Sequence, residues 1–210
     1  MKTNDKRSKL KRQAEYAGDG NVLDIGFSAN PNPFLANAVG VDIRLPAETP
    51  SNYREVAVCN LNEQSLPFAD NRFDAVIAGD VIEHLENPSQ FLRETHRVLK
   101  MNGRLVISTP QANDWWITMH NWFLRRWIRD PDQGEHLQNW TLLDMTRLLK
   151  KNGFTVDAVE GFVLRFPYLT LQIPVRRFPI LSWQVFYVAR KTHEPDRRVL
   201  VHIDGAWQSV

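Results

Sequence analysis

The sequence is short of cysteine, of long hydrophobic stretches and of net charge. Cys59 is the only cysteine in 210 residues, so the chain cannot form an internal disulfide and nothing indicates an oxidising compartment. No run of about 18 uncharged apolar residues occurs, which argues against a membrane-spanning helix. No apolar run follows the basic N-terminal residues, as it would in a secretory signal. We therefore expect a cytoplasmic protein, either soluble or peripheral at the membrane.

The near balance of charges argues against a nucleic-acid partner. The formal net charge is +2, whereas nucleic-acid binding requires a basic face rather than a slightly basic total. The segment 1–18 is a local exception, with basic residues at Lys2, Lys6, Arg7, Lys9, Lys11 and Arg12. We favour a solvated or frayed terminus for this segment, and the alternative is contact with anionic lipid or with a phosphate-bearing substrate.

Strands and helices alternate through the first 110 residues, an order that predicts an α/β fold with parallel strands joined by helical crossovers. Short apolar runs predict strands over residues 22–25, 38–43, 55–59, 73–78, 105–109, 154–159 and 182–190. Asn87 and Pro88 mark the start of a helix that runs to about residue 100 and ends at Asn102–Gly103. A second helix over 141–151 begins at Thr141.

The length predicts a single domain with additions. We place the basic segment at 1–18, the domain at 19–192 and a C-terminal tail at 193–210. Two insertions interrupt the domain, a tryptophan-rich segment at 110–140 and a proline-rich segment at 161–182. The sequence carries no signal of an oligomeric state.

Two acids at neighbouring strand ends predict a nucleoside site. Asp24 and Gly26 end the first strand, at the carboxyl edge where open parallel sheets bind ligands, and Asp42 ends the second strand. An acid at this spacing accepts hydrogen bonds from ribose hydroxyls in nucleotide-binding α/β folds. Two carboxylates would repel a phosphate, so the pattern fits a nucleoside better. The other interpretation, that each acid caps a following helix, explains one acid more easily than the pair.

Four segments in order resemble the class I S-adenosylmethionine-dependent methyltransferase family. They are VLDIGFSANPNP, VGVDI, LPFADNRFDAVIAGDVIEHLENP and FLRETHRVLKMNGRLVISTP, which together cover about residues 20–110. The resemblance implies a Rossmann-like, doubly wound, seven-stranded sheet that is mostly parallel with an antiparallel last strand. It also implies S-adenosyl-L-methionine as the cofactor.

The same resemblance assigns cofactor-binding residues by position. Asp24 and the backbone of Gly26 would hold the methionine end, Asp42 the ribose, and Ile43 would pack on the adenine. Asn60 is favoured over Asn62 for the adenine amino group. Gly79 and Asp80 would lie beside the sulfonium and the amino group, and Ser28 and Leu61 complete the cofactor-binding set.

The turn after Gly26 departs from the family pattern. Ser28 and Asn30 stand where further glycines are usual, and these residues tolerate the tight turn less freely than glycine does. A non-catalytic, cofactor-binding scaffold protein of the same fold is therefore the alternative to an enzyme. A nicotinamide-dependent oxidoreductase is disfavoured, because its pyrophosphate requires the glycines that this turn lacks.

Glu83 and His84 are the candidate catalytic residues, because they follow the fourth strand beside the expected cofactor. A base there would remove the proton of an alcohol acceptor, and an imidazole titrates near neutral pH. The alternative is that Glu83 favours a helix N-terminus and His84 packs or faces water. His120 and His136 flank the tryptophan-rich segment, and His136 joins the candidate set. No regular ligand spacing indicates a metal, so we expect none.

The tryptophan-rich segment is expected to select the acceptor. Asp114 would cap a helix with apolar residues around most of its surface, and three interpretations stay open: a core helix, a lid whose aromatic rings bind a sugar or flat acceptor, and a membrane-surface helix. The tryptophans are Trp115, Trp116, Trp122, Trp127 and Trp140. With ANPNP in the first turn, the chain also resembles bacterial methyltransferases of surface polysaccharide or lipid-linked glycan assembly. We therefore expect a small-molecule or glycan hydroxyl as acceptor.

Overall fold

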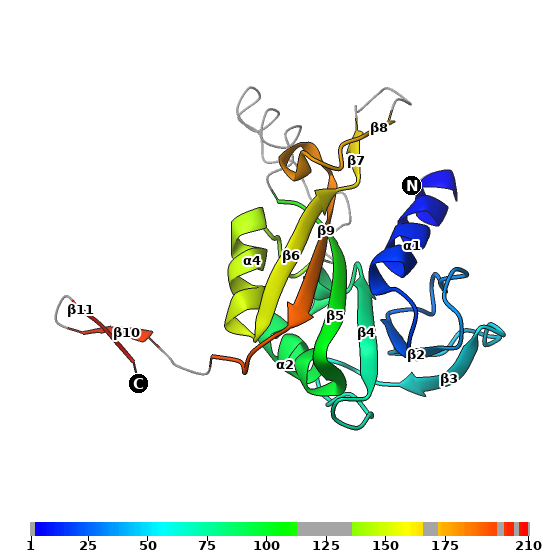
Figure 1. Cartoon of the computed structure of the whole chain (residues 1–210), viewed down its shortest axis with the longest axis horizontal. Coiled ribbons are helices and arrows are strands. Elements are labelled where there is room, and N and C mark those ends of the chain that lie inside the picture. Colours follow the sequence, from blue (N-terminus) through cyan, green and yellow to red (C-terminus); the bar gives the residue numbers. More distant parts are fainter. Residues whose placement is uncertain (1–2, 113–135, 166–171, 197–199, 204–205, 210) are drawn as a thin grey trace.

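The computed structural model describes residues 3–112, 136–165, 172–196, 200–203 and 206–209. Its centre is a seven-stranded sheet with the strand order β3-β2-β1-β4-β5-β9-β6 (Figure 1). The strands are β1 (Val22–Ile25), β2 (Ala38–Asp42), β3 (Tyr53–Val58), β4 (Phe73–Gly79), β5 (Leu99–Pro110), β6 (Phe154–Gly161) and β9 (Gln184–Lys191). The pairs formed among β1 to β5 are parallel, and β9 runs antiparallel to both β5 and β6. The expected doubly wound, mostly parallel sheet with an antiparallel last strand is confirmed.

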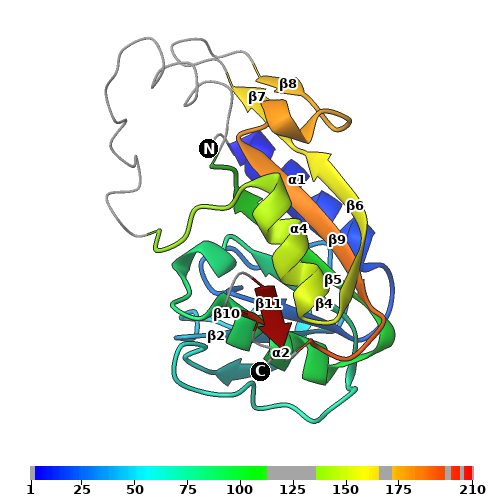
Figure 2. The same ribbon diagram turned by 90° about the vertical axis from the view of Figure 1, so that its left-hand side faces the viewer.

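Alternating side chains of the strands build a core on each face of the sheet. Leu23 and Val76 contribute to the larger core, with α2 (Pro88–Val98) and α4 (Leu142–Lys151) packed on it. Val22 and Ala75, their immediate neighbours, contribute to the smaller core under α1 (Thr3–Ala17). This alternation follows from the two-residue period of a strand. Figure 2 shows α4 and α1 on opposite sides of the sheet.

Local sequence explains where the two central helices begin. The Asn87 side chain accepts a hydrogen bond from the backbone N–H of Gln90, and Pro88 occupies the first turn of α2. Thr141 caps α4 in the same way, by accepting from the backbone N–H of Asp144. Both predicted starts are confirmed.

The predicted end of α2 is wrong. The helix stops at Val98, because Leu99 already pairs with Phe73 in the sheet. Asn102 does adopt a left-handed backbone, with φ of 63°, but it lies within β5 at an irregularity of the strand pairing and not at the end of the helix. Tertiary pairing thus overrides a local stop signal at this position.

Three peripheral segments carry structure that was not expected. The basic terminus was interpreted as solvated or frayed, whereas Thr3–Ala17 is helix α1 and contacts β4 and β5. The proline-rich segment forms short elements, β7 (Val163–Arg165), β8 (Gln172–Pro174) and η2 (Pro179–Leu181), and the expected tail contains an antiparallel hairpin of β10 (Leu200–Ile203) and β11 (Ala206–Ser209). Among the described residues, none of the helices combines the length and the apolar composition of a membrane span.

Most of the tryptophan-rich segment lies outside the described residues, including Asp114, His120 and four of its five tryptophans. The two ends of the segment meet in the structure. The N–H of Ala112 donates to the carbonyl oxygen of Trp140 at 2.9 Å, and Gln111 pairs with Trp140 in a parallel bridge. The described residues on either side of 113–135 therefore come together just after β5.

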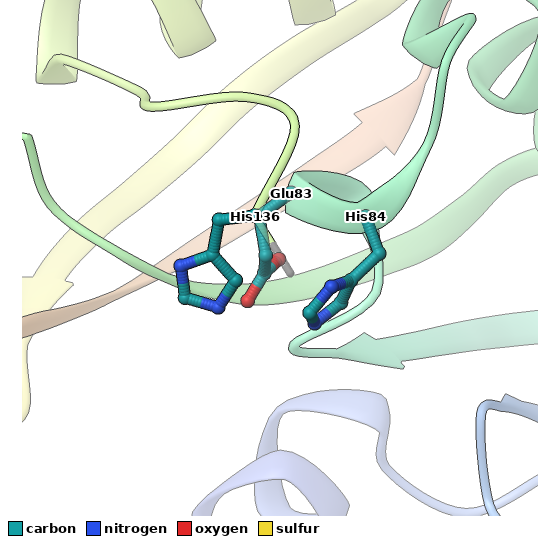
Figure 3. A group of neighbouring side chains, drawn as sticks. All are labelled: Glu83, His84 and His136. Carbon is teal, nitrogen blue, oxygen red and sulfur yellow. The ribbon is translucent and has the colours of Figure 1, made fainter. Parts of the chain in front are cut away.

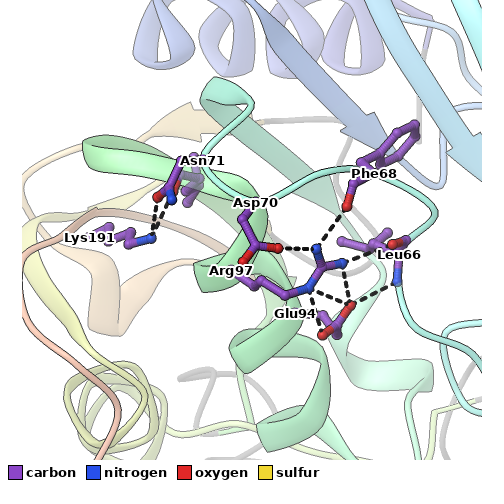
Figure 4. A network of polar contacts seen from close by, with 8 residues as sticks. Leu66, Phe68, Asp70, Asn71, Glu94, Arg97 and Lys191 are labelled. Carbon is purple, nitrogen blue, oxygen red and sulfur yellow. Dashed lines mark hydrogen bonds and ion pairs between the residues drawn. The ribbon is translucent and has the colours of Figure 1, made fainter.

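Arg97 of α2 ties the loop before β4 to the helix (Figure 4). Its guanidinium donates to the carbonyl oxygens of Leu66 and Phe68 at 2.9 and 2.8 Å, and it pairs with Glu94 and Asp70. The planar guanidinium group has five N–H donors in a fixed arrangement and can contact all of these acceptors at once. The single ammonium group of a lysine cannot do so.

We expect Arg97→Lys to lower the free energy of unfolding by about 2 kcal/mol, because two loop carbonyls and Glu94 lose directed donors. Urea unfolding followed by circular dichroism measures the change. Arg93→Lys, at an exposed position of the same helix, is the matched control and should change stability by less than about 0.5 kcal/mol. Equal stability of the two variants would contradict the importance of the Arg97 contacts.

Candidate functional site

A cavity of about 350 Å³ opens at the carboxyl ends of β1, β2 and β4, a volume in the range of small-molecule sites. The loops that follow these strands form its walls. Seven of the predicted site residues line it: Gly26, Asp42, Ile43, Asn60, Leu61, Asp80 and His84. The topology brings these residues together because the carboxyl ends of neighbouring parallel strands meet at one edge of the sheet.

Asp42 is held in place by two backbone donors. Its Oδ2 accepts from the N–H of Ser28 at 2.9 Å, and its Oδ1 accepts from the N–H of Ile43 at 2.7 Å. The side chain stays partly exposed in the cavity, so each oxygen keeps a lone pair for a ligand hydroxyl. Ser28 itself lines neither of the cavities at these strand ends; it contacts Asp42 through its N–H, and its side chain donates to the carbonyl oxygen of Arg44 at 2.6 Å.

Gly26 makes room at the turn between β1 and the following loop. Its φ is +76°, a left-handed conformation that glycine adopts without strain. A Cβ at this position would lie 2.7 Å from Cγ2 of Val81. The turn therefore forms with glycine at the first position, while Ser28 and Asn30 occupy the positions after it.

A second, smaller cavity of about 60 Å³ lies on the α1 side of the same strand ends. Asp24, Gly79 and Asp80 line it, as do Lys9 and Gln13 from α1. Ile25, Gly26 and Asp80 line both cavities, so the two lie next to each other. This space combines acids with a lysine, which suits a ligand group that carries both charges.

Asp24 is buried and holds a carboxyl that does not ionise readily. The Tyr53 hydroxyl donates to its Oδ2 at 2.5 Å. Burial is the main cause of a rise in the pKa of Asp24 to about 7; the hydrogen bond from Tyr53 opposes the rise, and the negative charge of Asp42 contributes to it. A positively charged group in the small cavity would favour the ionised form.

Asp80 is fixed from several sides in an uncommon conformation. Its φ is +57°, and its N–H donates to the carbonyl oxygen of Ser108 at 2.8 Å. Its carboxylate forms an ion pair with the buried Lys9 and accepts from Gln184. Non-glycine residues in this conformation cost energy and occur preferentially at functional sites.

The side chains of Glu83, His84 and His136 form a cluster (Figure 3), and His84 also lines the larger cavity. Glu83 and His84 lie on the short helix η1 (Ile82–His84), directly after β4. His136 lies near the C-terminal end of the tryptophan-rich segment. The backbone after it is held at η1, because the N–H groups of Leu137 and Gln138 both donate to the carbonyl oxygen of Glu83, at 2.9 and 3.0 Å. One ligand atom of each side chain lies within 4.8 Å of the other two. The centroids of the two imidazole rings are 4.9 Å apart.

The carboxyl of Glu83 is only partly satisfied. The side chain is 1% exposed, and its Oε2 accepts from the Thr109 hydroxyl at 3.0 Å. Its Oε1 is buried without a hydrogen-bond partner among the described residues. Burial, together with a smaller effect of the nearby charge of Asp80, raises the pKa of Glu83 to about 8.

Comparison with known proteins assigns the family. Residues 7–159 match the family model of a methyltransferase domain, which is more than half of the chain. The chain belongs to the class I S-adenosylmethionine-dependent methyltransferase family. The family match begins at residue 7, within α1.

Individual relatives agree with this assignment. A ubiquinone/menaquinone biosynthesis C-methyltransferase of Geotalea uraniireducens is 32% identical over 54% of this chain and 57% of its own length. An uncharacterized methyltransferase of Bacillus subtilis is 32% identical over 75% of this chain and 66% of its own. The chain spans about half the length or less of several other relatives. The solved structure of an S-adenosylmethionine-dependent methyltransferase of Thermotoga maritima superposes on this chain with a TM-score of 0.65 at 16% identity. The superposition covers 90% of this chain and 88% of that one, and it supports the assignment of the fold.

The side chains of Asn60 and Asn62 both accept hydrogen bonds from the backbone. Asn60 Oδ1 accepts from the N–H of Asn62 at 3.1 Å, and Asn62 Oδ1 accepts from the N–H of Glu86 at 3.0 Å. Both residues line the cavity. The preference for Asn60 as the adenine contact stays a prediction.

Sequence reasoning missed the residues that approach the site from distant elements. Lys9 and Gln13 come from α1, Tyr53 begins β3 and Gln184 begins β9. None of them belongs to a local pattern that points to chemistry. A hint was available only for α1, where Lys9 and Gln13 are four residues apart and so share one side of a helix.

Proposed function

We propose that this chain transfers a methyl group from S-adenosylmethionine to a hydroxyl of a small-molecule, sugar or lipid-linked glycan acceptor. The observation that carries the proposal is the cluster of Glu83, His84 and His136 beside the cavity at the strand ends. Three side chains able to accept a proton have converged there, and a hydroxyl acceptor needs such help because it is a weak acid that must lose its proton.

The residues of the two cavities fit the chemistry of the cofactor. In the larger cavity, Asp42 offers carboxylate oxygens to ribose hydroxyls, and Ile43 and Leu61 offer apolar surface to a flat base. In the smaller cavity, Asp24 and Lys9 provide charges opposite to those of an amino-acid end. The turn at Gly26 leaves open the space that a Cβ would fill.

Bound S-adenosylmethionine supplies a methyl group on a sulfonium, which is a good leaving group. The protein therefore needs chiefly to position the acceptor and to help its hydroxyl lose a proton. His84 lines the cavity, so the cluster has direct access to an acceptor there. An imidazole can take the proton itself, or a cation held by the three side chains can acidify the hydroxyl instead.

The sugar or lipid-linked part of the proposal rests on the resemblance of ANPNP and the tryptophan-rich segment to methyltransferases of glycan assembly. Tryptophan rings provide stiff apolar surface for a sugar ring, and tryptophan beside arginine suits a membrane surface. Ala112 and Trp140 join the two ends of this segment next to the strand ends where the cavity opens. His136, which belongs to the same segment, is a member of the cluster, so we expect an acceptor bound by the segment to approach it.

Two measurements test the proposal. S-adenosylhomocysteine should bind with micromolar affinity in calorimetry, and label from methyl-labelled S-adenosylmethionine should appear in alkali-stable methyl ethers when hydroxyl acceptors, sugars and lipid-linked glycans are screened. Amines and thiols are the matched control acceptors. Binding without transfer to any acceptor in cell extract would favour the scaffold alternative, transfer to amines alone would refute the hydroxyl assignment, and no binding at millimolar ligand would overturn the whole proposal.

A further inference from the structure

The cluster of Glu83, His84 and His136 has the composition of a metal site. Two imidazoles and one carboxylate form a ligand set that binds zinc and other divalent transition metals in proteins. The sequence alone led us to expect no metal, because His136 is far along the chain from Glu83 and His84 and no short ligand spacing links them. Only the folded chain brings the three together.

The backbone holds the two contributing segments against each other. Leu137 and Gln138 both donate their N–H groups to the carbonyl oxygen of Glu83, so the residue after His136 is bonded to the residue before His84. On the other side, Glu83 lies on η1 between the end of β4 and α2. The donor atoms are therefore positioned by hydrogen bonds of the main chain and not by surface side chains that meet by chance.

The Glu83 carboxylate provides the second, independent observation. The residue is 1% exposed, and its Oε1 has no hydrogen-bond partner among the described residues. Leaving a buried carboxyl oxygen without a partner is costly, and a cation at this point would remove the cost. The Thr109 hydroxyl donates to the other oxygen, Oε2, and so orients the carboxylate as partners of metal ligands commonly do.

We propose that Glu83, His84 and His136 bind one divalent transition-metal ion of the Zn²⁺ class, with open coordination positions toward the cofactor cavity. Three protein ligands leave room for an exogenous oxygen, as in catalytic zinc sites. His84 lines the cavity, so this open side faces the place of the acceptor.

This inference rests on the proposed function and specifies how the cluster acts in it. A hydroxyl bound to the ion loses its proton to solvent water and keeps the electron pair of the broken O–H bond on oxygen. A bound divalent cation lowers the pKa of a coordinated water from 15.7 to about 7, and an alcohol is acidified for the same reason. The two histidines then serve as neutral ligands, and no imidazole has to carry the proton.

Direct metal binding tests the proposal with the full chain. Protein stripped by a chelator should bind about one Zn²⁺ in calorimetry and about one Co²⁺ with visible absorption bands typical of bound cobalt. We expect Glu83→Gln, His84→Asn and His136→Asn each to weaken the binding of both ions at least about 10-fold. His193→Asn and Glu86→Gln, at exposed positions that are not part of the cluster, are the matched controls and should bind as the unmodified chain does.

Binding of S-adenosylhomocysteine by each variant shows whether its fold and cofactor cavity are intact. His136→Asn is the most informative variant, because His136 is only half-buried and lies outside the helices and strands. The proposal is overturned if neither ion binds below about 1 mM, or if His84→Asn and His136→Asn variants that bind S-adenosylhomocysteine normally also bind both ions normally.

Activity separates this proposal from the assignment of the acceptor. Metal binding at the cluster without methylation of any hydroxyl supports the metal site and refutes only the acceptor. Equal rates of hydroxyl methylation by stripped and Zn²⁺-loaded protein would leave the acceptor assignment standing and overturn the role of the ion.

Discussion

Replacement of Asp24 by asparagine should stabilise the protein without cofactor at pH 8 and weaken its binding of S-adenosylhomocysteine about 100-fold. The two effects have opposite signs because the buried carboxylate is costly when nothing pairs with it. Burial raises its pKa from 3.8 to about 7 in the folded chain. Asparagine keeps the size of the side chain and can still accept the Tyr53 hydrogen bond, but it carries no charge.

The pH dependence of the stability effect has a definite sign. Below about pH 4, Asp24 is protonated in both the folded and the unfolded chain, so the unmodified protein and Asp24→Asn should differ little. Between about pH 4 and pH 7 the unfolded chain releases the proton while the folded chain keeps it, and the unmodified protein loses stability. Above this window the difference is constant, at about 2–4 kcal/mol in favour of the variant.

Urea unfolding at pH 5 and pH 8, followed by calorimetry with S-adenosylhomocysteine, measures both effects. Asp19→Asn, at an exposed acid after α1, is the charge-matched control and should show neither. An Asp24→Asn variant that is less stable than the unmodified chain at pH 8 would contradict the burial argument. Unchanged binding would remove Asp24 from the cofactor site.

Asp42→Ala should weaken S-adenosylhomocysteine binding about 100-fold or more while leaving the protein folded. The carboxylate lines the larger cavity and is held by the N–H groups of Ser28 and Ile43, so its free lone pairs are oriented before a ligand arrives. A hydrogen bond to a charged group contributes about 1.5–3 kcal/mol to binding. In the variant, two ribose hydroxyls would lose their hydrogen bonds to the carboxylate.

Calorimetry with S-adenosylhomocysteine and with adenine alone separates the contributions. The Asp42→Ala variant should lose affinity for the nucleoside ligand and should bind free adenine as the unmodified protein does, because the base contacts Ile43 and Leu61 in the proposal. Thermal unfolding without ligand checks the fold, and Asp19→Asn again serves as control. Equal losses for both ligands would indicate that the loop after β2 had rearranged.

Local sequence was sufficient to predict the scaffold of the site. Asp24, Gly26 and Asp42 end short apolar strands, and parallel strands present their carboxyl ends at one edge, so their proximity follows from the strand pattern. The caps at Asn87 and Thr141 follow from side-chain oxygens within a few residues of the N–H groups that they bind. The family resemblance added the cofactor, which the residues alone left as a nucleoside.

Local sequence failed where distant segments meet. Asn102 predicts a helix end, but pairing of Leu99 with Phe73 ends the helix earlier. The basic terminus was expected to be frayed, yet α1 buries Lys9 against Asp80, because its apolar side covers one face of the sheet.

Asp24 and Asp42, the two acids at neighbouring strand ends, have different environments in the structure. Both end strands, and the sequence by itself determined that they lie at one edge of the sheet. Only the tertiary structure decided that Asp24 is buried beside Tyr53 while Asp42 is partly exposed in the larger cavity. The same holds for Glu83 and His136, which backbone hydrogen bonds between separate segments bring together. Strand patterns and caps act over a few residues and can be predicted from the sequence, whereas burial and long-range pairing depend on the whole packed chain.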